Sequence, residues 1–216
     1  MSIKNNLLKI KSTLSENVTL VAVSKTKPVS DLMEAYEAGQ RIFGENKIQE
    51  MSEKFEQMPK DIEWHMIGHV QTNKVKFMAS FVSLVHGVDS LKLLEEINKQ
   101  ALKNNRIIDC LLQIHIAEED TKFGLDEKEL NDLLNTEIFK NLKNINVKGL
   151  MGMATFTENQ DQIKKEFLHL KTIFDKISIH NSDFSILSMG MSGDYQLAID
   201  CGSTMIRIGS SIFGTR

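Results

Sequence analysis

Residues 18–28 read Val-Thr-Leu-Val-Ala-Val-Ser-Lys-Thr-Lys-Pro, and this stretch indicates how the rest of the chain is organised. Its first half is rich in apolar and β-branched residues, which is typical of a strand buried on both faces of a parallel sheet. Pro28 ends the pattern because proline cannot continue a hydrogen-bonded strand. The stretch therefore predicts a central parallel strand that leads into a short polar loop.

Lys25 stands where this strand runs out. Because side chains alternate along a strand, Lys25 shares a face with Val21 and Val23, and we expect it at the strand end on the core-facing side. Burial lowers the pKa of a lysine and exposes a neutral amine, as a Schiff-base nucleophile requires. A solvated lysine in a strand-to-helix loop is the alternative that this segment alone leaves open.

Strand-like and helix-like segments alternate along the whole chain. Further strands are expected at 41–46, 62–68, 84–89, 107–116, 147–154, 184–190 and 205–209. Helical spacing predicts helices at 3–14, 32–38, 47–57, 72–80, 90–101, 127–140, 157–174 and 194–201. Thr157 and Gln160 have the spacing of a capping box, so Thr157 is expected to cap the helix after the sixth strand.

The alternation indicates an α/β protein, and two architectures compete. An open doubly wound sheet of the dinucleotide-binding type is disfavoured, because no G-x-G-x-x-G follows the first strand. Eight strand–helix units favour a single (β/α)8 TIM barrel with tight loops, a short N-terminal helix and one domain over residues 1–216.

Composition narrows the class of protein. A net charge of −3 and a pI near 6.1 give no basic field for nucleic acid. The two cysteines, Cys110 and Cys201, are far apart in sequence and indicate a reducing compartment rather than a disulfide framework. No apolar run approaches the ~20 residues that span a bilayer, and the N-terminus does not read as a signal peptide. We expect a cytoplasmic monomer without membrane or nucleic-acid partners.

In a barrel the strands end at one rim, where active sites lie. Polar side chains gather at the predicted strand ends: Lys25, Glu45, Asn46, His65, His69, Asp89, His115, Ser188, Ser192 and Arg207. His65 and His69 are four residues apart, but Gly68 interrupts them on a strand end rather than a helix face. A zinc site is therefore not predicted.

Two loops after the last strands are typical of a phosphate site. Residues 188–194 read Ser-Met-Gly-Met-Ser-Gly-Asp, and Gly209, Ser210 and Ser211 follow the eighth strand. Barrels often bind phosphate with the loops after strands 7 and 8, and small residues let the backbone approach closely. Glycine-serine turns without a ligand are the alternative for either loop alone.

Arg207 lies in an apolar strand, and a buried guanidinium needs a partner. A carboxylate such as Asp89 or Asp200 is one candidate. The ring nitrogen of pyridoxal 5′-phosphate (PLP) is the other, because Lys25, Arg207 and a phosphate loop match the three anchoring points of that cofactor.

The sequence resembles the pyridoxal phosphate homeostasis proteins, a family related to the N-terminal barrel domain of alanine racemase. The resemblance covers nearly the whole chain. It rests on 21–28 (VAVSKTKP), 43–46 (FGEN) with Gln49-Glu50, 64–74 (WHMIGHVQTNK), 121–124 (TKFG), 149–151 (GLM), 187–192 (LSMGMS), and 202–209 (GSTMIRIG) with 212–214 (IFG).

The resemblance implies that Lys25 holds PLP as an internal aldimine and that Arg207 faces the pyridine nitrogen. It implies that Ser192 and the backbone of Gly209 and Ser210 hold the phosphate. Asn46 and His65 match motif positions near the cofactor. The family is thought to buffer and carry PLP, supporting vitamin B6 and amino-acid balance, with PLP-dependent apoenzymes as possible recipients.

A carrier without catalytic turnover is the function that the resemblance implies, and a weakly active PLP-dependent amino-acid racemase is the alternative. An arginine at the pyridine nitrogen keeps it unprotonated, which weakens the ring as an electron sink. Racemases of this fold add a tyrosine base from a second domain, whereas Tyr36 and Tyr195 are expected in helices here, leaving His65 as a candidate base. A cofactor-free Schiff-base lyase acting on a phosphosugar is a third hypothesis.

For three further residues, the sequence predicts no role in binding or transferring PLP. His86 is expected to be structural or solvated. Lys27 and Lys122 do not occupy clear inward strand positions, so a role in PLP transfer is not predicted for either.

Overall fold

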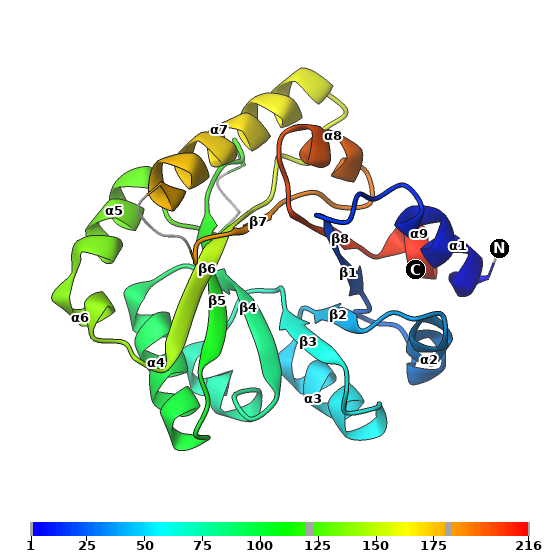
Figure 1. Ribbon diagram of the computed structural model, residues 1–216, viewed down its shortest axis with the longest axis horizontal. Helices are drawn as coiled ribbons and strands as arrows, with labels where there is room; N and C mark the ends of the chain where they lie inside the picture. The colour runs from blue at the N-terminus through cyan, green and yellow to red at the C-terminus, as the bar shows by residue number, and fades with distance from the viewer. Residues whose placement is uncertain (1, 120–122, 180–182, 216) are drawn as a thin grey trace.

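The computed structural model describes residues 2–119, 123–179 and 183–215 and shows a closed barrel of eight parallel strands in chain order (Figure 1). The predicted (β/α)8 architecture is therefore confirmed. Pairing of Thr19–Ala22 with Met205–Ile208 closes the barrel between the first strand and the last. The strands are β1 (Thr19–Val23), β2 (Ile42–Glu45), β3 (Glu63–Met66), β4 (Val82–Val88), β5 (Ile108–Ile114), β6 (Ile145–Gly152), β7 (Ile186–Ser188) and β8 (Met205–Ile208).

Helices form a ring around the strands (Figure 1). The first helix, α1, lies beside the last, and the side-chain amide of Asn6 donates to the carbonyl of Ile212 over 3.0 Å. The two ends of the chain therefore meet on one side of the barrel. The helices are α1 (Ile3–Lys11), α2 (Val29–Glu37), α3 (Ile48–Gln57), the 3-10 helix η1 (Thr72–Phe77), α4 (Leu91–Lys103), α5 (Glu127–Asn135), α6 (Glu137–Lys140), α7 (Gln160–Ser178), α8 (Tyr195–Asp200) and α9 (Ser210–Phe213).

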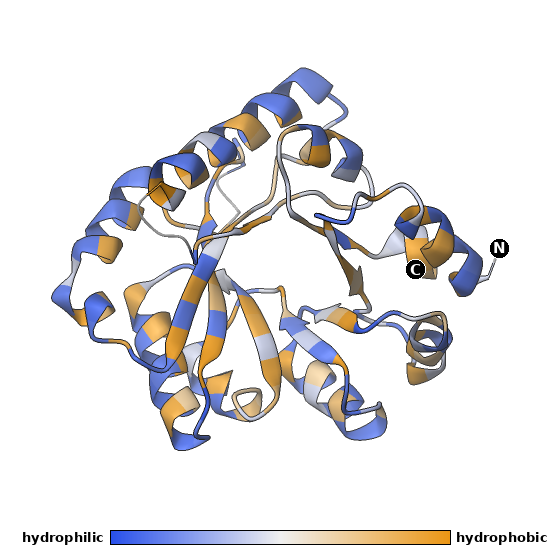
Figure 2. Cartoon of the chain, viewed as in Figure 1, coloured by the Kyte–Doolittle hydropathy of each residue, from blue (hydrophilic) through white to orange (hydrophobic). Residues whose placement is uncertain are grey.

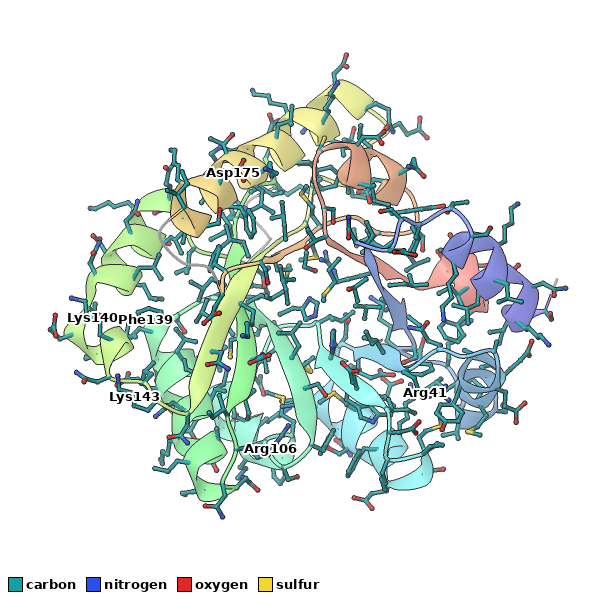
Figure 3. All side chains as sticks on the ribbon, in the orientation of Figure 1. Arg41, Arg106, Phe139, Lys140, Lys143 and Asp175 are labelled. Carbon is teal, nitrogen blue, oxygen red and sulfur yellow. The ribbon has the colours of Figure 1, made fainter. Side chains whose placement is uncertain are left out.

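The apolar residues divide into two clusters, one on each side of the barrel wall. The larger cluster lies between the strands and the helices, and Figure 2 shows hydrophobic residues on the inner stripes of the helices. The smaller cluster fills the barrel interior with one side chain from each of five strands: Val21, Leu84, Leu111, Met151 and Met205. Long charged side chains such as Lys140 and Lys143 lie at the outer edge of the molecule (Figure 3).

Three helix predictions need correction. The helix expected at 3–14 ends at Lys11, and the one expected at 72–80 is a short 3-10 helix. The helix expected at 127–140 is interrupted at Thr136, whose hydroxyl caps a separate short helix by accepting from the amide of Phe139. Extended backbone at Thr136 is a cap conformation, which is why one periodic pattern became two helices.

The predicted capping role of Thr157 is wrong. Asn159 caps α7 instead, because its side-chain oxygen accepts from the amide of Gln162 over 3.2 Å. The hydroxyl of Thr157 accepts from the amide of Asn159 and so shapes the turn before the helix. Either residue type can cap a helix, and the path of the incoming loop decides between them.

Candidate functional site

A cavity of about 760 Å³ opens at the carboxyl ends of the strands. Six of the seven residues predicted for the site line it, and each comes from the end of a strand or the loop that follows. They are Lys25, Asn46, Ser192, Arg207, Gly209 and Ser210. The seventh, His65, does not line this cavity and lies deeper in the barrel.

Lys25 follows β1 rather than ending it. The strand stops at Val23, and the amide of Ser24 donates to the carbonyl of Gly44 on the neighbouring strand. Lys25 is therefore half-buried at the wall of the cavity instead of fully buried in the core. The alternation rule places its direction correctly, but the strand is two residues shorter than the sequence indicates.

The loops after β7 and β8 meet around the hydroxyl of Ser192. That oxygen accepts from the amides of Gly209, over 3.3 Å, and Ser211, over 3.4 Å. A side chain at position 209 would lie 3.2 Å from the carbonyl oxygen of Val23, so glycine lets the backbone pack against β1. Two amides and one hydroxyl thus converge at one point, which is a donor set suited to a phosphate group.

Arg207 is buried on β8 and donates to two neutral acceptors. Its Nη1 lies 2.7 Å from the hydroxyl of Ser188, and its Nη2 lies 3.1 Å from the carbonyl of Gly152. The carboxylate partners considered for it lie elsewhere, since Asp89 pairs with His69 and Asp200 is exposed on α8. Burial lowers the pKa of Arg207 to about 10, against the opposing charge of Asp194, so the guanidinium stays cationic at neutral pH.

The bond from Arg207 to Ser188 continues through two histidines inside the barrel. His86 Nδ1 lies 3.2 Å from the hydroxyl of Ser188, and His86 Nε2 lies 3.1 Å from His65 Nδ1. Burial lowers the pKa of His65 to about 3. Burial is the main cause that lowers the pKa of His86 well below its usual value, and the positive charge of Arg207 and coupling to His65 add to it. Both imidazoles are therefore neutral.

Neutral imidazoles give this buried row a direction. A guanidinium only donates, so the hydroxyl of Ser188 accepts from Arg207 and is left to donate to His86 Nδ1. His86 then carries its proton on Nε2 and donates to His65, and this assignment satisfies every contact in the row. His65 thus reaches Arg207 through two intermediates, and His86, expected to be structural or solvated, is one of them.

A third imidazole, His69, lines the cavity itself, unlike His65 and His86. Its Nδ1 lies 3.2 Å from a carboxylate oxygen of Asp89, and its ring stacks on Phe123 at a centroid distance of 4.1 Å. His65 and His69 therefore have separate partners rather than sharing a ligand. No group of three or more histidine, cysteine or acidic side chains is placed to hold a metal ion within the described residues.

Lys27 donates from Nζ to the carbonyl of Phe213 over 2.9 Å, which ties the loop after β1 to the end of α9. Lys122 lies outside the described residues.

Comparison with known proteins supplies the family. A model of the alanine racemase N-terminal domain matches residues 1–216. The pyridoxal phosphate homeostasis protein of Aquifex aeolicus (strain VF5) is 39% identical over 199 residues, covering 91% of this chain and 86% of that protein. The chain belongs to the pyridoxal phosphate homeostasis protein family.

Solved structures of this family superpose closely on the chain. PipY of Synechococcus elongatus PCC7942 without PLP gives a TM-score of 0.92 at 32% identity, covering 99% of this chain and 100% of that one. The form of PipY with PLP bound gives 0.89 at the same identity and coverage. An alanine racemase of Clostridium difficile 630, at 17% identity and a TM-score of 0.77, shares the fold over 100% of this chain and 56% of its own.

The sequence predicts no membrane-spanning segment, and the helices that the structure describes agree with this. Across residues 2–119, 123–179 and 183–215, no helix combines the length and the apolar character needed to cross a bilayer.

Proposed function

We propose that this protein binds PLP through Lys25, holding it as a Schiff base and supplying it for intracellular vitamin B6 and amino-acid homeostasis without catalytic turnover. The observation that carries the proposal is one cavity lined by a lysine, a buried arginine and a backbone anion cradle: Lys25, Arg207 and the Ser192–Gly209–Ser211 cluster. The homeostasis proteins of this family and the PLP-bound form of PipY support it.

The residues present fit each part of PLP. The amides of Gly209 and Ser211 and the hydroxyl of Ser192 would hold the phosphate, with the adjacent Ser210 at the start of α9. Arg207 would face the ring nitrogen, and Lys25 would bind the aldehyde, which is the reactive group that PLP supplies when bound. Asn46 lines the same cavity and would contact the ring or the phosphate.

The electrostatics of Arg207 favour a carrier over an enzyme. A guanidinium that remains cationic keeps a facing ring nitrogen unprotonated, because two positive charges in contact repel each other. An unprotonated ring draws electrons less strongly from a bound amine. The row from Ser188 to His65 consists of neutral groups, so it holds Arg207 in place without offsetting its charge.

A low racemase activity remains the second candidate because of one observation. His69, oriented by Asp89, lines the same cavity as Lys25 and supplies an acid–base group there. Tyr36 instead donates to Asp61 outside the barrel, and Tyr195 begins α8. His69 therefore replaces His65 as the candidate base for that activity.

The compartment, the oligomeric state and the recipients of PLP follow from the same proposal. We infer a cytoplasmic monomer in which residues 1–216 act as one PLP-binding unit and PLP-dependent apoenzymes are the recipients. Both cysteines are unpaired and buried, and burial raises the pKa of the Cys110 thiol, which suits a reducing compartment.

The test is a PLP titration followed by visible absorbance, with two lysine variants compared. Lys25→Ala is expected to abolish the imine band. Lys27→Arg is the matched control, since arginine keeps a donor to the carbonyl of Phe213 but forms no stable imine. Wild-type protein with PLP is expected to leave the enantiomeric ratio of L-alanine unchanged. Measurable racemisation that His69→Asn abolishes would instead support the second candidate.

A further inference from the structure

A buried lysine lies behind the loop that carries Lys25. Lys54 on α3 has a side chain only 7% exposed, and its Nζ lies 2.7 Å from Glu45, 2.7 Å from Glu50 and 2.8 Å from the carbonyl of Ser24. Three acceptors therefore satisfy the three donors of the ammonium group. Two of them are carboxylates and the third is the backbone of the loop.

The same two carboxylates hold the residues on either side of Lys25. Glu45 accepts from the hydroxyl of Ser24 over 2.6 Å. Glu50 accepts from the amide of Thr26 over 2.5 Å. We call Glu45, Glu50 and Lys54 the loop anchor, because it fixes the residue before Lys25 and the residue after it.

The backbone at Thr26 explains why an anchor is needed. Its φ is 62°, in the left-handed region that a β-branched residue rarely adopts. Such a conformation persists only where surrounding contacts impose it. The amide of Thr26 donates to a charged carboxylate, and bonds to charged groups are among the stronger hydrogen bonds in proteins.

The two carboxylates of the loop anchor, Glu45 and Glu50, lie in different environments. The side chain of Glu45 is fully buried, and desolvation raises its pKa despite the bonds from Lys54 and Ser24; its Oε2 has no partner among the described atoms. For Glu50, burial is outweighed by the bonds from Lys54 and Thr26, so its pKa is lowered. Glu50 is thus the carboxylate that its surroundings keep ionised more readily, and it is the member that touches Thr26.

We propose that Glu50, supported by Lys54 and Glu45, is a positioning residue that holds Thr26 in its left-handed conformation and so directs Lys25 into the cavity. The inference rests on the proposed function, because it assigns the anchor a purpose in PLP binding. None of these three side chains lines the cavity, so the effect acts through the backbone of the loop.

Glu50→Ala is the informative variant, because the Glu50 side chain is 23% exposed and its removal leaves the more deeply buried Lys54–Glu45 pair in place. Loss of a bond between a charged group and an amide predicts a rise of about tenfold in the dissociation constant for PLP. Glu50→Gln is expected to recover most of the affinity, since its amide oxygen still accepts from Thr26. Glu53→Ala, an exposed glutamate on the same helix, is the matched control.

A second measurement uses the PLP-free protein. Hydrogen exchange at the amide of Thr26, followed by NMR, is expected to be about tenfold faster in Glu50→Ala than in wild type, because exchange reports local opening. Glu50→Gln and Glu53→Ala are expected to keep the wild-type rate.

The two proposals fail in different ways. Wild-type protein that does not bind PLP would overturn the proposed function, while exchange at Thr26 would still decide whether the anchor orders the loop. Glu50→Ala that binds PLP and exchanges at Thr26 as wild type does would overturn the inference alone. An equal loss in Glu53→Ala would also overturn it, by showing a general effect of α3.

Discussion

Two buried cations in this protein, Lys54 and Arg207, have opposite kinds of hydrogen-bond partner. Lys54, outside the barrel wall, is surrounded by the carboxylates of Glu45 and Glu50. Arg207, inside the wall, donates to the hydroxyl of Ser188 and a backbone carbonyl, with neutral imidazoles beyond. A buried charge that is matched locally indicates a structural role. One whose hydrogen-bond partners among the described residues are neutral, with Asp194 as the opposing charge and a cavity beside it, is a candidate for contacting a ligand.

Removing Lys54 should cause the largest loss of unfolding free energy. Lys54→Met leaves two carboxylates facing each other without their cation, and losing one partner of a buried ion pair costs about 3–5 kcal/mol of unfolding free energy. Urea denaturation of the PLP-free protein measures this loss. The double variant Glu45→Gln/Lys54→Met is the control, and it should recover part of the stability because the more deeply buried charge is gone. A Lys54→Met protein as stable as wild type would contradict the account.

Removing Arg207 should cost less stability and more binding. Arg207→Met leaves neutral acceptors rather than charges behind, so the expected loss of unfolding free energy is about 1–3 kcal/mol. The same variant should bind PLP at least about tenfold more weakly, since a charged contact is lost. Urea denaturation and PLP titration on one preparation give both values. If Arg207→Met lost more stability than Lys54→Met, the contrast between the two cations would be wrong.

The neutral histidines beside Arg207 should make the unfolding free energy depend on pH. The pKa of His65 in the folded protein, about 3, lies below its unfolded value, so the unfolded chain binds more protons as the pH falls. The stability that this neutral histidine contributes is present above the unfolded pKa of about 6.5 and is lost below it. Between pH 7 and pH 5, His65→Leu should lose less unfolding free energy than wild type, by about 1–2 kcal/mol.

The experiment is a series of urea denaturations across this range, with His169→Leu as the control on α7. His169 is exposed, so its substitution controls for replacing a histidine by leucine outside the buried row. Equal pH slopes for wild type and His65→Leu would mean that His65 is not held neutral in the folded protein.

The barrel and six of the seven proposed site residues in the cavity could be predicted from the sequence, because they depend on local patterns. The strand at 18–23 and the glycine-serine loops carry their own signals, and a parallel barrel brings strand ends together whatever the side chains in between. The strand ends therefore predict that Lys25, Arg207 and Gly209 share one rim, and all three line the cavity. Their roles toward PLP stay predictions.

The buried networks could not be predicted, because they depend on contacts between elements. The sequence indicates only a structural or solvated role for His86, although a polar residue between the inward-facing Leu84 and the buried Val88 is a signal of a buried polar contact. Lys54 likewise lies on the buried face of α3 that Ile48 and Met51 define. In each case the residue was visible, but its partner came from another element whose register no local pattern fixes.

The central claim is that Lys25 anchors PLP, and borohydride reduction followed by peptide mass analysis tests it most directly. Trypsin cleaves unmodified protein after Lys25, giving peptides 12–25 and 26–41, and it does not cleave before Pro28. Reduction of the PLP-loaded protein should instead yield peptide 12–41 carrying one phosphopyridoxyl group on Lys25. The same group on any other lysine, with peptide 12–25 intact, would contradict the account.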